Sequence, residues 1–531
     1  MATETSLRPF TLSDAAGTDY SFPSGRPALL CVVHEECQTC ALSMPLIEAT
    51  HRAFGSAVDV WAIGQDSPGN TTLIERHNLT IPMLDDDALA VSFAYDLDTV
   101  PAIFLADGNG GELQSFIGFG KEDWQSVHAA MASLSGVAVP EVDWSAYPES
   151  RPGCGSRSVE PGIAERLIAE SEGSPLRARR VEIGEQDDIH EFLYDQDLTD
   201  GLPVVPPTPE RVLRMLGGTK RDAQEEVAVV PPNMAPVTVE KVAINAVMAG
   251  CKPEYLPVVL TAIEAMCTDE FNIHGVSATT MGATPMMLIN GPIRDKIGLN
   301  YQLGALGPGH RANSAIGRAV RLVLRNVGGG KPGGTERSTL SNPAKLALCF
   351  AEWEERAPWD PYHVEHGFEP EDSVVTLFAA TGGPTMIVDQ ASRDARQIGG
   401  TIGMAMEAVA HPKAHGASDT FLVLCPEHLD TLQTNGWTKD ELRARIQEAS
   451  SRPLRDLLQD EDSGAGIPIG RFGDDGPSEE QLDRLIPKFA DPSSIHIVVA
   501  GSDAGKFSSV FQGWATGPRG SQIVSRKIEE A

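Results

Sequence analysis

The sequence predicts an α/β protein with more than one domain, and three observations support this prediction. The chain has 531 residues, more than a single hydrophobic core usually organises. Short apolar runs alternate with helical patterns from the start, as in parallel strands joined by helices. Hydrophobic residues make up 41% of the chain and charged residues 22%, as in ordinary folded proteins. We expect one α/β domain over residues 1–135 and a larger mixed α/β catalytic region over 186–531, with room for two subdomains.

The N-terminal domain is predicted from a strand-helix-strand pattern that closes with a hairpin and a helix. Residues 28–33 and 58–63 are apolar runs that predict buried strands, and the stretch at 43–54 predicts a helix between them. A Gly-Asn-Gly-Gly run at 108–111 separates two apolar runs and indicates a hairpin. The last helix is expected at 121–134. This order predicts a sheet with parallel strands.

A change of composition separates this domain from the rest of the chain. Residues 136–185 are rich in Pro, Gly, Ser and charged residues, which is typical of a linker. Beyond them, helical patterns alternate with short apolar runs that end in Gly, Ala or Pro, as strands leading into active-site loops do. The expected helices are 239–250, 255–266 and 314–329, and the expected strands are 286–292, 374–380, 420–426 and 495–501.

Charge and cysteine content narrow the function classes. The net charge is -32, and so acidic a surface repels phosphate backbones and anionic lipids, which disfavours nucleic acid and membranes as partners. The N-terminus lacks a signal-peptide pattern and no apolar run reaches about 18 residues, so we expect a cytoplasmic protein. Eight cysteines are too few for a disulfide scaffold in such a chain. Spaced thiols then indicate catalysis or metal binding.

The clearest chemical signal is the pair Cys37 and Cys40. Cys37 follows the strand at 28–33 and is expected at the first turn of a helix, where unpaired backbone N–H groups and the helix dipole favour a thiolate. Cys37 would attack, and Cys40, one turn further along, would resolve the mixed disulfide. The expected reactive group is a redox-active disulfide, with no bound cofactor assigned. Two alternatives stay open: a domain used only for docking, and a soft metal held by His34 with both cysteines.

Further motifs accompany this pair. They are the Cys-Gln-Thr-Cys sequence at 37–40, Pro45 five residues later, and Thr-Val-Pro at 99–101 before the hairpin. On these motifs, residues 7–135 resemble the thioredoxin superfamily, in particular the TlpA/ResA-type thiol-disulfide oxidoreductases and their peroxiredoxin-like cousins. The resemblance implies that Pro101 is a cis-proline that faces the redox pair and docks an extended partner chain, and that a thiol protein donates electrons.

Some positions depart from the patterns of these families. Glu36 stands where thioredoxins have an aromatic residue, and Cys31 stands where they keep a buried carboxylate. The negative charge of Glu36 is expected to raise the pKa of Cys37. His34 stands where peroxiredoxins have Thr, which disfavours peroxidase activity.

Cys251 is the first candidate for a reactive thiol in the C-terminal region. Gly250 ends one predicted helix and Pro253 fits the first turn of the next, so that Cys251 would lie at a helix N-terminus beside Lys252. A helix N-terminus and a neighbouring lysine both depress the pKa of a thiol. The commoner alternative is a small buried cysteine in a helix turn.

Two other cysteines are weaker candidates. Cys154 lies in a Gly-rich part of the predicted linker, where it is either a mobile electron carrier or simply exposed. Cys425 ends a predicted strand, and His428 follows as a potential base. Sequence neighbours rarely face one another across a helix start, so a packed strand end is the favoured interpretation.

A glycine-rich turn before a basic helix predicts an anion site. The Gly-Pro-Gly turn at 307–309 leads through Asn313 or Ser314 as N-cap into a helix, with Arg311 at its mouth. The same helix carries a basic face that would either bind a ligand or pair with acids, formed by Arg318, Arg321 and Arg325. Lys506 is expected to face a pocket at the end of the strand at 495–501. The glycine spacing there does not fit a phosphate loop, so no nucleotide is predicted.

Two histidine pairs have spacings found in metal sites. His363 and His366 are separated by three positions, and His411 and His415 by four. Pro412 would break a helix that aligns the second pair. Surface histidines are the favoured interpretation, and a metal ion stays an alternative.

The C-terminal region also resembles a known family. Its segments at 200–212, 245–259, 305–329 and 425–446 resemble the uncharacterised UGSC family of (seleno)proteins, over roughly 195–531. The resemblance supplies no catalytic residue, and a Sec-Gly-Ser-Cys motif is missing from the sequence.

The leading hypothesis is an oxidoreductase whose N-terminal domain exchanges electrons with Cys251. Cys154 would serve as carrier, and Arg311, Arg318 and Lys506 would hold a small anionic substrate. Fusion keeps the two thiols at an effective concentration on the order of millimolar. One alternative is a metal- or cysteine-dependent lyase or hydrolase with the N-terminal domain as a docking or dimerisation module, so a homodimer is left open. Another is a non-enzymatic thiol relay or metal-handling protein.

Overall fold

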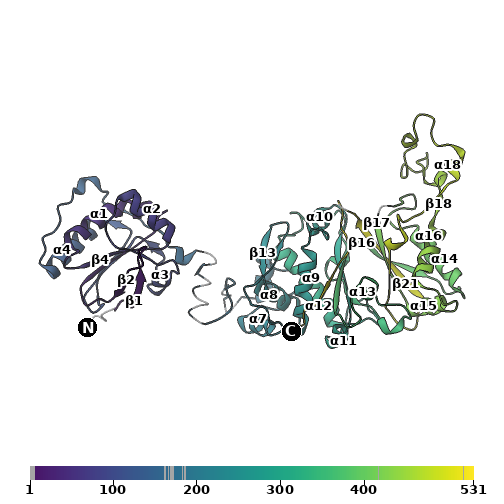
Figure 1. The fold of residues 1–531 in the computed structure, drawn as a ribbon, viewed down its shortest axis with the longest axis horizontal. Coiled ribbons are helices and arrows are strands. Elements are labelled where there is room, and N and C mark those ends of the chain that lie inside the picture. The colour runs from purple at the N-terminus through teal and green to yellow at the C-terminus, as the bar shows by residue number, and fades with distance from the viewer. Residues whose placement is uncertain are drawn as a thin grey trace. The chain divides into compact units, whose positions relative to one another are not determined.

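The computed structural model divides the chain into two compact units, Met1–Val181 and Glu182–Ala531 (Figure 1). It describes residues 6–530 except 161–162, 165–166, 168–170, 172, 182, 185–186, 417 and 518. Each unit has its own sheet and its own hydrophobic core. The α/β class is confirmed for both.

A five-stranded sheet organises the N-terminal unit. Its strand order is β5-β4-β3-β7-β8, with β3, β4 and β5 parallel and with β7 antiparallel to both of its neighbours. The bounds are β3 Ala28–Val33, β4 Asp59–Gly64, β5 Met83–Asp85, β7 Ala102–Ala106 and β8 Glu112–Ile117. The predicted strands at 28–33 and 58–63 and the hairpin at 108–111 are confirmed.

Helices join and cover these strands because their apolar faces complete the core. Met44 and Ile47 of α1 (Gln38–Phe54) and Trp124 of α4 (Lys121–Ser135) are fully buried. Figure 1 shows α1 beside β4, the strand that follows it in the chain. The other elements of this part are β1 Phe10–Ser13, β2 Asp19–Phe22, α2 Ser67–His77, α3 Ala90–Ala94, β6 Thr99–Val100 and β9 Phe119–Gly120.

The first half of the predicted linker belongs to the N-terminal unit. Strand β10 (Ser150–Arg151) pairs with β9, and β11 (Cys154–Gly155) pairs with β6. Trp144 and Tyr147 pack against the core of this unit. The prediction of a linker that begins at residue 136 is therefore wrong, because a composition rich in Pro and Gly did not prevent backbone pairing. Several residues between 161 and 186 lie outside the described part of the chain.

A seven-stranded mixed sheet organises the second unit. Its main path is β15-β14-β16-β21-β17-β20, and β22 also pairs with β16. The pairs β14/β15 and β17/β20 are parallel, and the others are antiparallel. The bounds are β14 Thr284–Asn290, β15 Cys349–Ala351, β16 Val374–Val388, β17 Ser418–Leu424, β20 Ile495–Val499, β21 Phe507–Ala515 and β22 Val524–Lys527.

Both faces of this sheet are covered. Leu422 and Leu424 of β17 belong to one hydrophobic cluster and Phe421 and Val423 to another, because successive side chains of a strand point to opposite faces. The first cluster is completed by three helices (Figure 1): α14 Ala395–Met406, α15 Pro426–Gln433 and α16 Lys439–Ser450. The helices α9 (Leu256–Met266) and α12 (Arg311–Asn326) pack together with α8 (Val239–Ala249).

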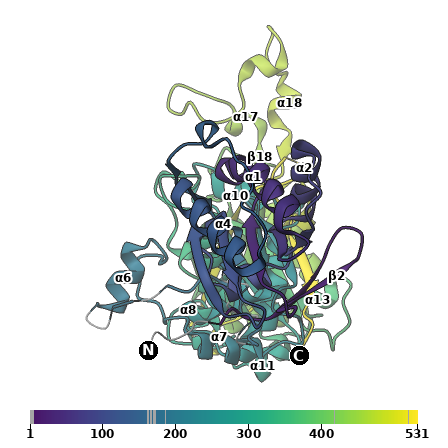
Figure 2. The same ribbon diagram turned by 90° about the vertical axis from the view of Figure 1, so that its left-hand side faces the viewer.

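Shorter elements complete the second unit. They are α6 Ile189–Asp195, α7 Pro209–Leu216, β12 Glu226–Val230, β13 Ala235–Thr238, α10 Ile273–Ala278, α11 Ile293–Lys296, α13 Tyr362–Glu365, β18 Arg452–Pro453, α17 Leu454–Leu457, α18 Glu479–Asp483 and β19 Leu485–Ile486. Figures 1 and 2 show that the segment with α17 and α18 projects from the rest of this unit. In the described part of the chain, no helix combines the length and the apolar character that crossing a bilayer requires.

Candidate active site

Cys37 occupies the N-cap of α1, directly after β3 and a short loop. Its sulfur accepts the backbone N–H of Cys40 at 3.2 Å and lies 3.4 Å from the carbonyl oxygen of Val100. The Cys40 thiol, together with the Cys154 thiol and the backbone N–H groups of Cys40 and Thr39, lowers the pKa of Cys37 to about 5, although burial acts in the opposite direction. The expectation that Glu36 raises the pKa of Cys37 is wrong, because the Glu36 side chain is exposed and the sulfur is held by hydrogen bonds.

Both cysteines of the pair are buried, with Cys37 1% exposed and Cys40 0% exposed. The Cys40 sulfur accepts the backbone N–H of His34 at 3.4 Å. Burial, followed by the hydrogen bond to Cys37, raises the pKa of Cys40 far above its ordinary value. Cys40 is therefore a neutral thiol that stabilises the Cys37 thiolate. The roles of Cys37 as attacking and Cys40 as resolving sulfur stay a prediction.

The segment before β7 brings Pro101 next to the pair. The peptide bond between Val100 and Pro101 is cis, as the resemblance implied. The preceding residue, Val100, is the one whose carbonyl lies against the Cys37 sulfur. Strand β6, which ends at Val100, pairs with β11 of the same chain. An extended partner chain that docked on this edge would have to displace β11.

Cys154 is a third thiol at this site. Strand β11 places Cys154 opposite Val100, whose carbonyl oxygen lies 3.4 Å from the Cys37 sulfur, and Cys154 packs against the core of this unit. The neighbouring Cys37 sulfur, followed by burial, raises the pKa of Cys154. The expectation of a mobile linker thiol is wrong, because strand pairing holds Cys154 in place. Its involvement with Cys37 was predicted, although the sequence did not indicate how the two would meet.

Cys251 does not have the environment that its sequence predicted. Gly250 ends α8 in the left-handed conformation, as expected, and Lys252 precedes a short 3-10 turn. However, Cys251 is 7% exposed, and burial raises its pKa to about 12 despite the opposing charge of Arg311. The prediction of a depressed pKa is therefore wrong. The alternative of a small buried cysteine fits this position.

Cys425 and His428 are brought together through a residue that the sequence did not point to. The hydroxyl of Ser508, on β21, lies 3.5 Å from the Cys425 sulfur and 2.7 Å from Nδ1 of His428. The other ring nitrogen of His428 lies 3.1 Å from the carbonyl oxygen of Asp389. Burial opposes ionisation, but hydrogen bonds with His428 and Ser508 lower the pKa of Cys425 overall. A reactive thiol in the second unit is therefore better placed at Cys425 than at Cys251.

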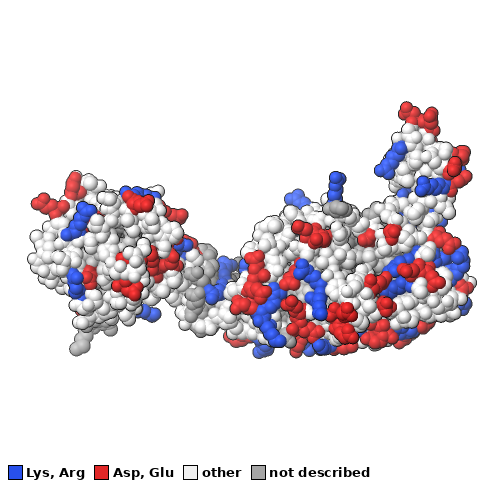
Figure 3. All heavy atoms as spheres, viewed as in Figure 1, with Lys and Arg blue, Asp and Glu red and all other residues white. Residues whose placement is uncertain are grey.

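The arginines of α12 are paired with acids or carbonyls. Arg318 forms a bidentate ion pair with Asp200, at 2.8 and 2.6 Å, and Arg325 pairs with Asp197. Arg311 donates to the carbonyl of Gly250 at 2.9 Å, and the half-buried Arg321 donates to the carbonyl of Lys345 at 3.1 Å. Figure 3 shows acidic and basic side chains interspersed on the visible face of this unit. The charge of Arg318 is engaged by Asp200, which does not support its predicted role in binding an anion. Arg311 contacts only a neutral carbonyl, and its role in binding an anion stays a prediction.

The start of α12 also differs from the prediction. The helix begins at Arg311 with His310 as N-cap, and no side chain caps it. Asn313, expected as a cap, instead accepts the N–H of Asn300 at 2.9 Å and donates to the Asn300 carbonyl at 2.9 Å. Asn313 therefore fixes the loop before the helix.

Lys506 lines a cavity near the ends of β17 and β20. The cavity has a volume of about 260 Å³, and its lining includes Arg393, Ser392 and Glu427. Glu427 belongs to α15, whose N-cap is Cys425. Lys506 therefore faces a cavity, as predicted, but Glu427 and Asp430 line it together with the two cations, and the role of Lys506 in binding an anion stays a prediction.

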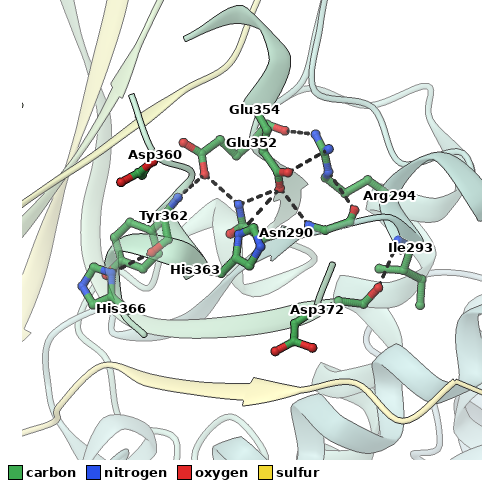
Figure 4. Close-up of polar contacts among 12 residues, drawn as sticks. Asn290, Ile293, Arg294, Glu352, Glu354, Asp360, Tyr362, His363, His366 and Asp372 are labelled. Atoms are coloured by element: carbon green, nitrogen blue, oxygen red, sulfur yellow. Dashed lines mark hydrogen bonds and ion pairs between the residues drawn. The ribbon is translucent and has the colours of Figure 1, made fainter. Parts of the chain in front are cut away.

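The predicted histidine pairs do not converge on one point. Figure 4 shows His363 beside Asn290 and Glu354, whereas His366 stacks on Tyr362 with ring centroids 4.0 Å apart. The nearest approach of His363 to Glu354 is 4.0 Å. His415 lies 2.9 Å from a backbone carbonyl oxygen, that of Pro487. Within the described ranges, no group of three or more His, Cys, Asp or Glu side chains is arranged to hold a metal ion.

Comparison with known proteins places the likeness in the N-terminal quarter of the chain. The thioredoxin domain of a thiol-disulfide oxidoreductase from Bacteroides vulgatus is 20% identical, with a TM-score of 0.23, covering 25% of this chain and 99% of its own. A secreted disulfide oxidoreductase of Mycobacterium tuberculosis, homologous to Escherichia coli DsbE, and StoA from Bacillus subtilis are each 20% identical, with TM-scores of 0.21, covering 24% of this chain and 96% of their own.

No family model and no curated protein matches the chain. Nothing in the comparisons supports the resemblance of residues 195–531 to the UGSC family. The order of the five strands, the cysteine pair at the start of α1 and the cis-proline before β7 are features of the structure itself. By this arrangement, the N-terminal unit has the thioredoxin fold that the motifs of residues 7–135 implied.

Proposed function

We propose that the N-terminal unit is a thiol-disulfide oxidoreductase in which Cys37 is the nucleophile. The observation that supports this proposal is the position of the Cys37 sulfur, which accepts a backbone N–H at the start of α1 and has a pKa of about 5. A thiolate is the reactive form in disulfide exchange, and this pKa makes it the main form at neutral pH.

The proposed reaction proceeds in two exchange steps. The Cys37 thiolate attacks a disulfide R–S–S–R′, so that a Cys37–S–S–R bond forms and R′–S⁻ leaves. A second protein thiolate then attacks the Cys37 sulfur, releases R–S⁻ and leaves a disulfide within the protein. The two electrons that reduce the substrate come from two protein thiols, and a thiol protein that donates electrons restores them.

The test is the replacement of Cys37 by serine. Cys37→Ser should slow the reduction of oxidised glutathione on the order of 10³-fold or more, because the covalent intermediate is lost. Cys267→Ser is the matched control, since this half-buried cysteine lies in the second unit and burial raises its pKa to about 12. A Cys37→Ser protein that reduces the disulfide at the wild-type rate would exclude the proposal.

The role of the second unit is a finer part of the proposal. Electrons from Cys37 would reach a thiol of the second unit that acts on a small anionic substrate, and Cys425 replaces Cys251 as the candidate. The supporting observations are the lowered pKa of Cys425 and the cavity with Lys506 and Arg393 beside α15. In a redox relay, Cys37→Ser and Cys425→Ser would each abolish turnover of this anionic substrate.

A cysteine-dependent lyase or hydrolase is the second candidate function. The Cys425, Ser508 and His428 arrangement favours it, because a thiol linked to a histidine is a common nucleophile and base. The N-terminal unit would then serve for docking or dimerisation. In that case Cys37→Ser would keep full turnover of the substrate, whereas Cys425→Ser would lose it.

A further inference from the structure

The edge of β6 is occupied by a segment of the same chain. Cys154 pairs with Val100 and Gly155 with Thr99 in antiparallel register. The N–H of Ser156 donates to the carbonyl of Asp98 at 2.9 Å, which continues the pairing beyond β11. An antiparallel strand added to a free edge is a common way for a protein to bind an extended chain. Here the added strand carries a cysteine.

Contacts on the other side fix this segment against the start of α1. The Thr39 hydroxyl donates to the carbonyl of Pro152 at 2.7 Å. Arg151 donates to the side-chain oxygen of Gln38 at 2.7 Å. Gln38 and Thr39 belong to the first turn of α1, and Arg151 and Pro152 are the two residues before Gly153. The segment is therefore held between β6 and the helix N-terminus.

Both cysteines lie at the start of α1. Cys37 is the N-cap of this helix, and its sulfur accepts the N–H of Cys40 at 3.2 Å. Cys154 is paired with Val100, whose carbonyl oxygen lies 3.4 Å from the Cys37 sulfur, so β11 brings Cys154 next to the attacking thiol. The positive end of the helix favours a thiolate on Cys37.

Gly153 permits this close approach. A Cβ atom at Gly153 would lie 2.5 Å from the Val100 carbonyl oxygen and 2.5 Å from the Thr99 methyl carbon. Both distances are too short for real contacts, so any larger residue would push β11 away from β6. A Cβ atom at Gly155 would meet nothing within 4 Å. These two glycines offer a disruptive substitution and a matched harmless one.

We propose that Cys154 is a resolving thiol for Cys37, so that turnover passes through a Cys37–Cys154 disulfide. The inference rests on the proposed function, because it needs Cys37 to form a mixed disulfide. The Cys154 thiolate attacks the Cys37 sulfur of Cys37–S–S–R, the Cys37–Cys154 bond forms, and R–S⁻ leaves with the electron pair of the broken bond. The oxidant is the disulfide R–S–S–R′ itself, and the proton of Cys154 goes to solvent.

Accessibility favours Cys154 over Cys40 in this step. Cys40 is fully buried, whereas Cys154 is partly exposed. A thiol must lose its proton before it attacks, and burial disfavours that charge. Water reaches Cys154 and accepts its proton more easily. Cys40 remains able to exchange later with the Cys37–Cys154 disulfide.

The first experiment follows glutathione on Cys37. Full-length wild-type, Cys40→Ser, and Cys40→Ser/Cys154→Ser proteins are reduced, treated with oxidised glutathione, quenched in acid, alkylated and mapped by mass spectrometry. The double variant should keep glutathione on Cys37, because both resolving thiols are gone. Cys40→Ser should release about 90% of the glutathione and form a disulfide between the peptides of Cys37 and Cys154. In wild-type protein this cross-link can be told from a Cys37–Cys40 disulfide, because trypsin leaves Cys37 and Cys40 on one peptide.

The outcomes separate the inference from the function on which it rests. Equal retention of glutathione on Cys37 in Cys40→Ser and in the double variant would overturn the role of Cys154 while leaving Cys37 as the nucleophile. No glutathione on Cys37 in the double variant would overturn the proposed function, and the inference with it. The Cys37–Cys154 peptide in oxidised wild-type protein is the supporting result that does not depend on any variant folding.

The second experiment uses the two glycines in the Cys40→Ser protein. Gly153→Ala should raise the fraction of Cys37 that retains glutathione severalfold, because β11 is displaced and Cys154 with it. Gly155→Ala should leave this fraction unchanged. Equal retention in both alanine variants would overturn the claim that pairing of β11 with β6 delivers Cys154 to Cys37.

Discussion

Cys37 in the N-terminal unit and Cys251 in the second unit hold similar positions in the sequence. Each lies directly before a helical turn, where unpaired N–H groups should favour a thiolate. The pKa of Cys37 is nevertheless lowered to about 5, whereas that of Cys251 is raised to about 12. The same local pattern thus leads to opposite ionisation in the two units.

The difference lies in what surrounds each sulfur. Both side chains are buried, at 1% exposed for Cys37 and 7% for Cys251. The N–H of Cys40 and two neighbouring thiols lower the pKa of Cys37 against the effect of burial, whereas at Cys251 only the charge of Arg311 opposes burial. Cys37 is itself the N-cap of α1, whereas Cys251 lies one residue before Lys252, the N-cap of the 3-10 turn that leads into α9. A helix N-terminus activates a thiol only when its N–H groups reach the sulfur and burial does not outweigh them.

The largest expected effect is the difference in alkylation between these two cysteines. At pH 7 the two pKa values give thiolate populations that differ about 10⁵-fold. The weaker nucleophilicity of a low-pKa thiolate offsets about 10³ of this, which leaves a rate ratio of about 100-fold before burial is considered. Iodoacetamide labelling followed by peptide mapping measures it.

The labelling rates of Cys37 and Cys251 should also depend on pH in different ways. The labelling rate of Cys37 should stay constant above pH 6 and fall as the pH drops through about 5, because its lowered pKa keeps the thiolate until then. The rate at Cys251 should rise with pH toward about 12. Equal labelling rates of Cys37 and Cys251 at neutral pH would contradict the difference between their pKa values.

Cys425 sharpens the comparison, because it is buried like Cys251 but has hydrogen-bond partners. His428→Ala should lower its labelling rate severalfold at pH 7, because the interaction with His428 that lowers the pKa of Cys425 is lost. His128→Gln is the control, since this buried histidine lies in the other unit and contacts Thr50. An unchanged rate at Cys425 in the His428→Ala protein would show that burial alone governs this thiol.

Two buried carboxylates show a smaller contrast of the same kind. Glu48 accepts hydrogen bonds from Thr80, Ile81 and Arg52, which lower its pKa to about 2 against the effect of burial. Glu352 is buried in the second unit (Figure 4), and there burial raises the pKa. The charge of Glu48 therefore stabilises its unit, whereas the charge of Glu352 opposes folding.

These shifts predict opposite responses to pH and to substitution. The stability contributed by Glu48 is present above pH 4.5 and is lost as the pH falls toward 2, and Glu48→Gln should cost about 1–3 kcal/mol at pH 7. The raised pKa of Glu352 gives stability at low pH that is lost as the pH rises, so Glu352→Gln should leave stability unchanged or increase it. Hydrogen-deuterium exchange of each unit's strands measures both changes in stability. A loss of stability in Glu352→Gln as large as that in Glu48→Gln would contradict the predicted difference between the two carboxylates.

Local sequence patterns determined most of the N-terminal fold and part of its site. The apolar run at 28–33 became β3, the glycines at 108–111 became a hairpin, and Cys37 lies at the helix start where the motif placed it. Such features depend on side chains a few positions apart, through periodicity, turn conformation and capping. The same reasoning located the helix at 239–250, which ends at Gly250 as predicted.

Tertiary structure alone decided which thiols have partners. Cys154 meets Cys37 because β11 pairs with β6, Cys425 meets Ser508 because β17 pairs with β21, and Cys251 is buried by packing. The pairing of Arg318 with Asp200 likewise joins distant segments. No local pattern encodes these contacts, because strand pairing and burial depend on residues far apart in the chain, and it is those contacts that set the pKa of a sulfur.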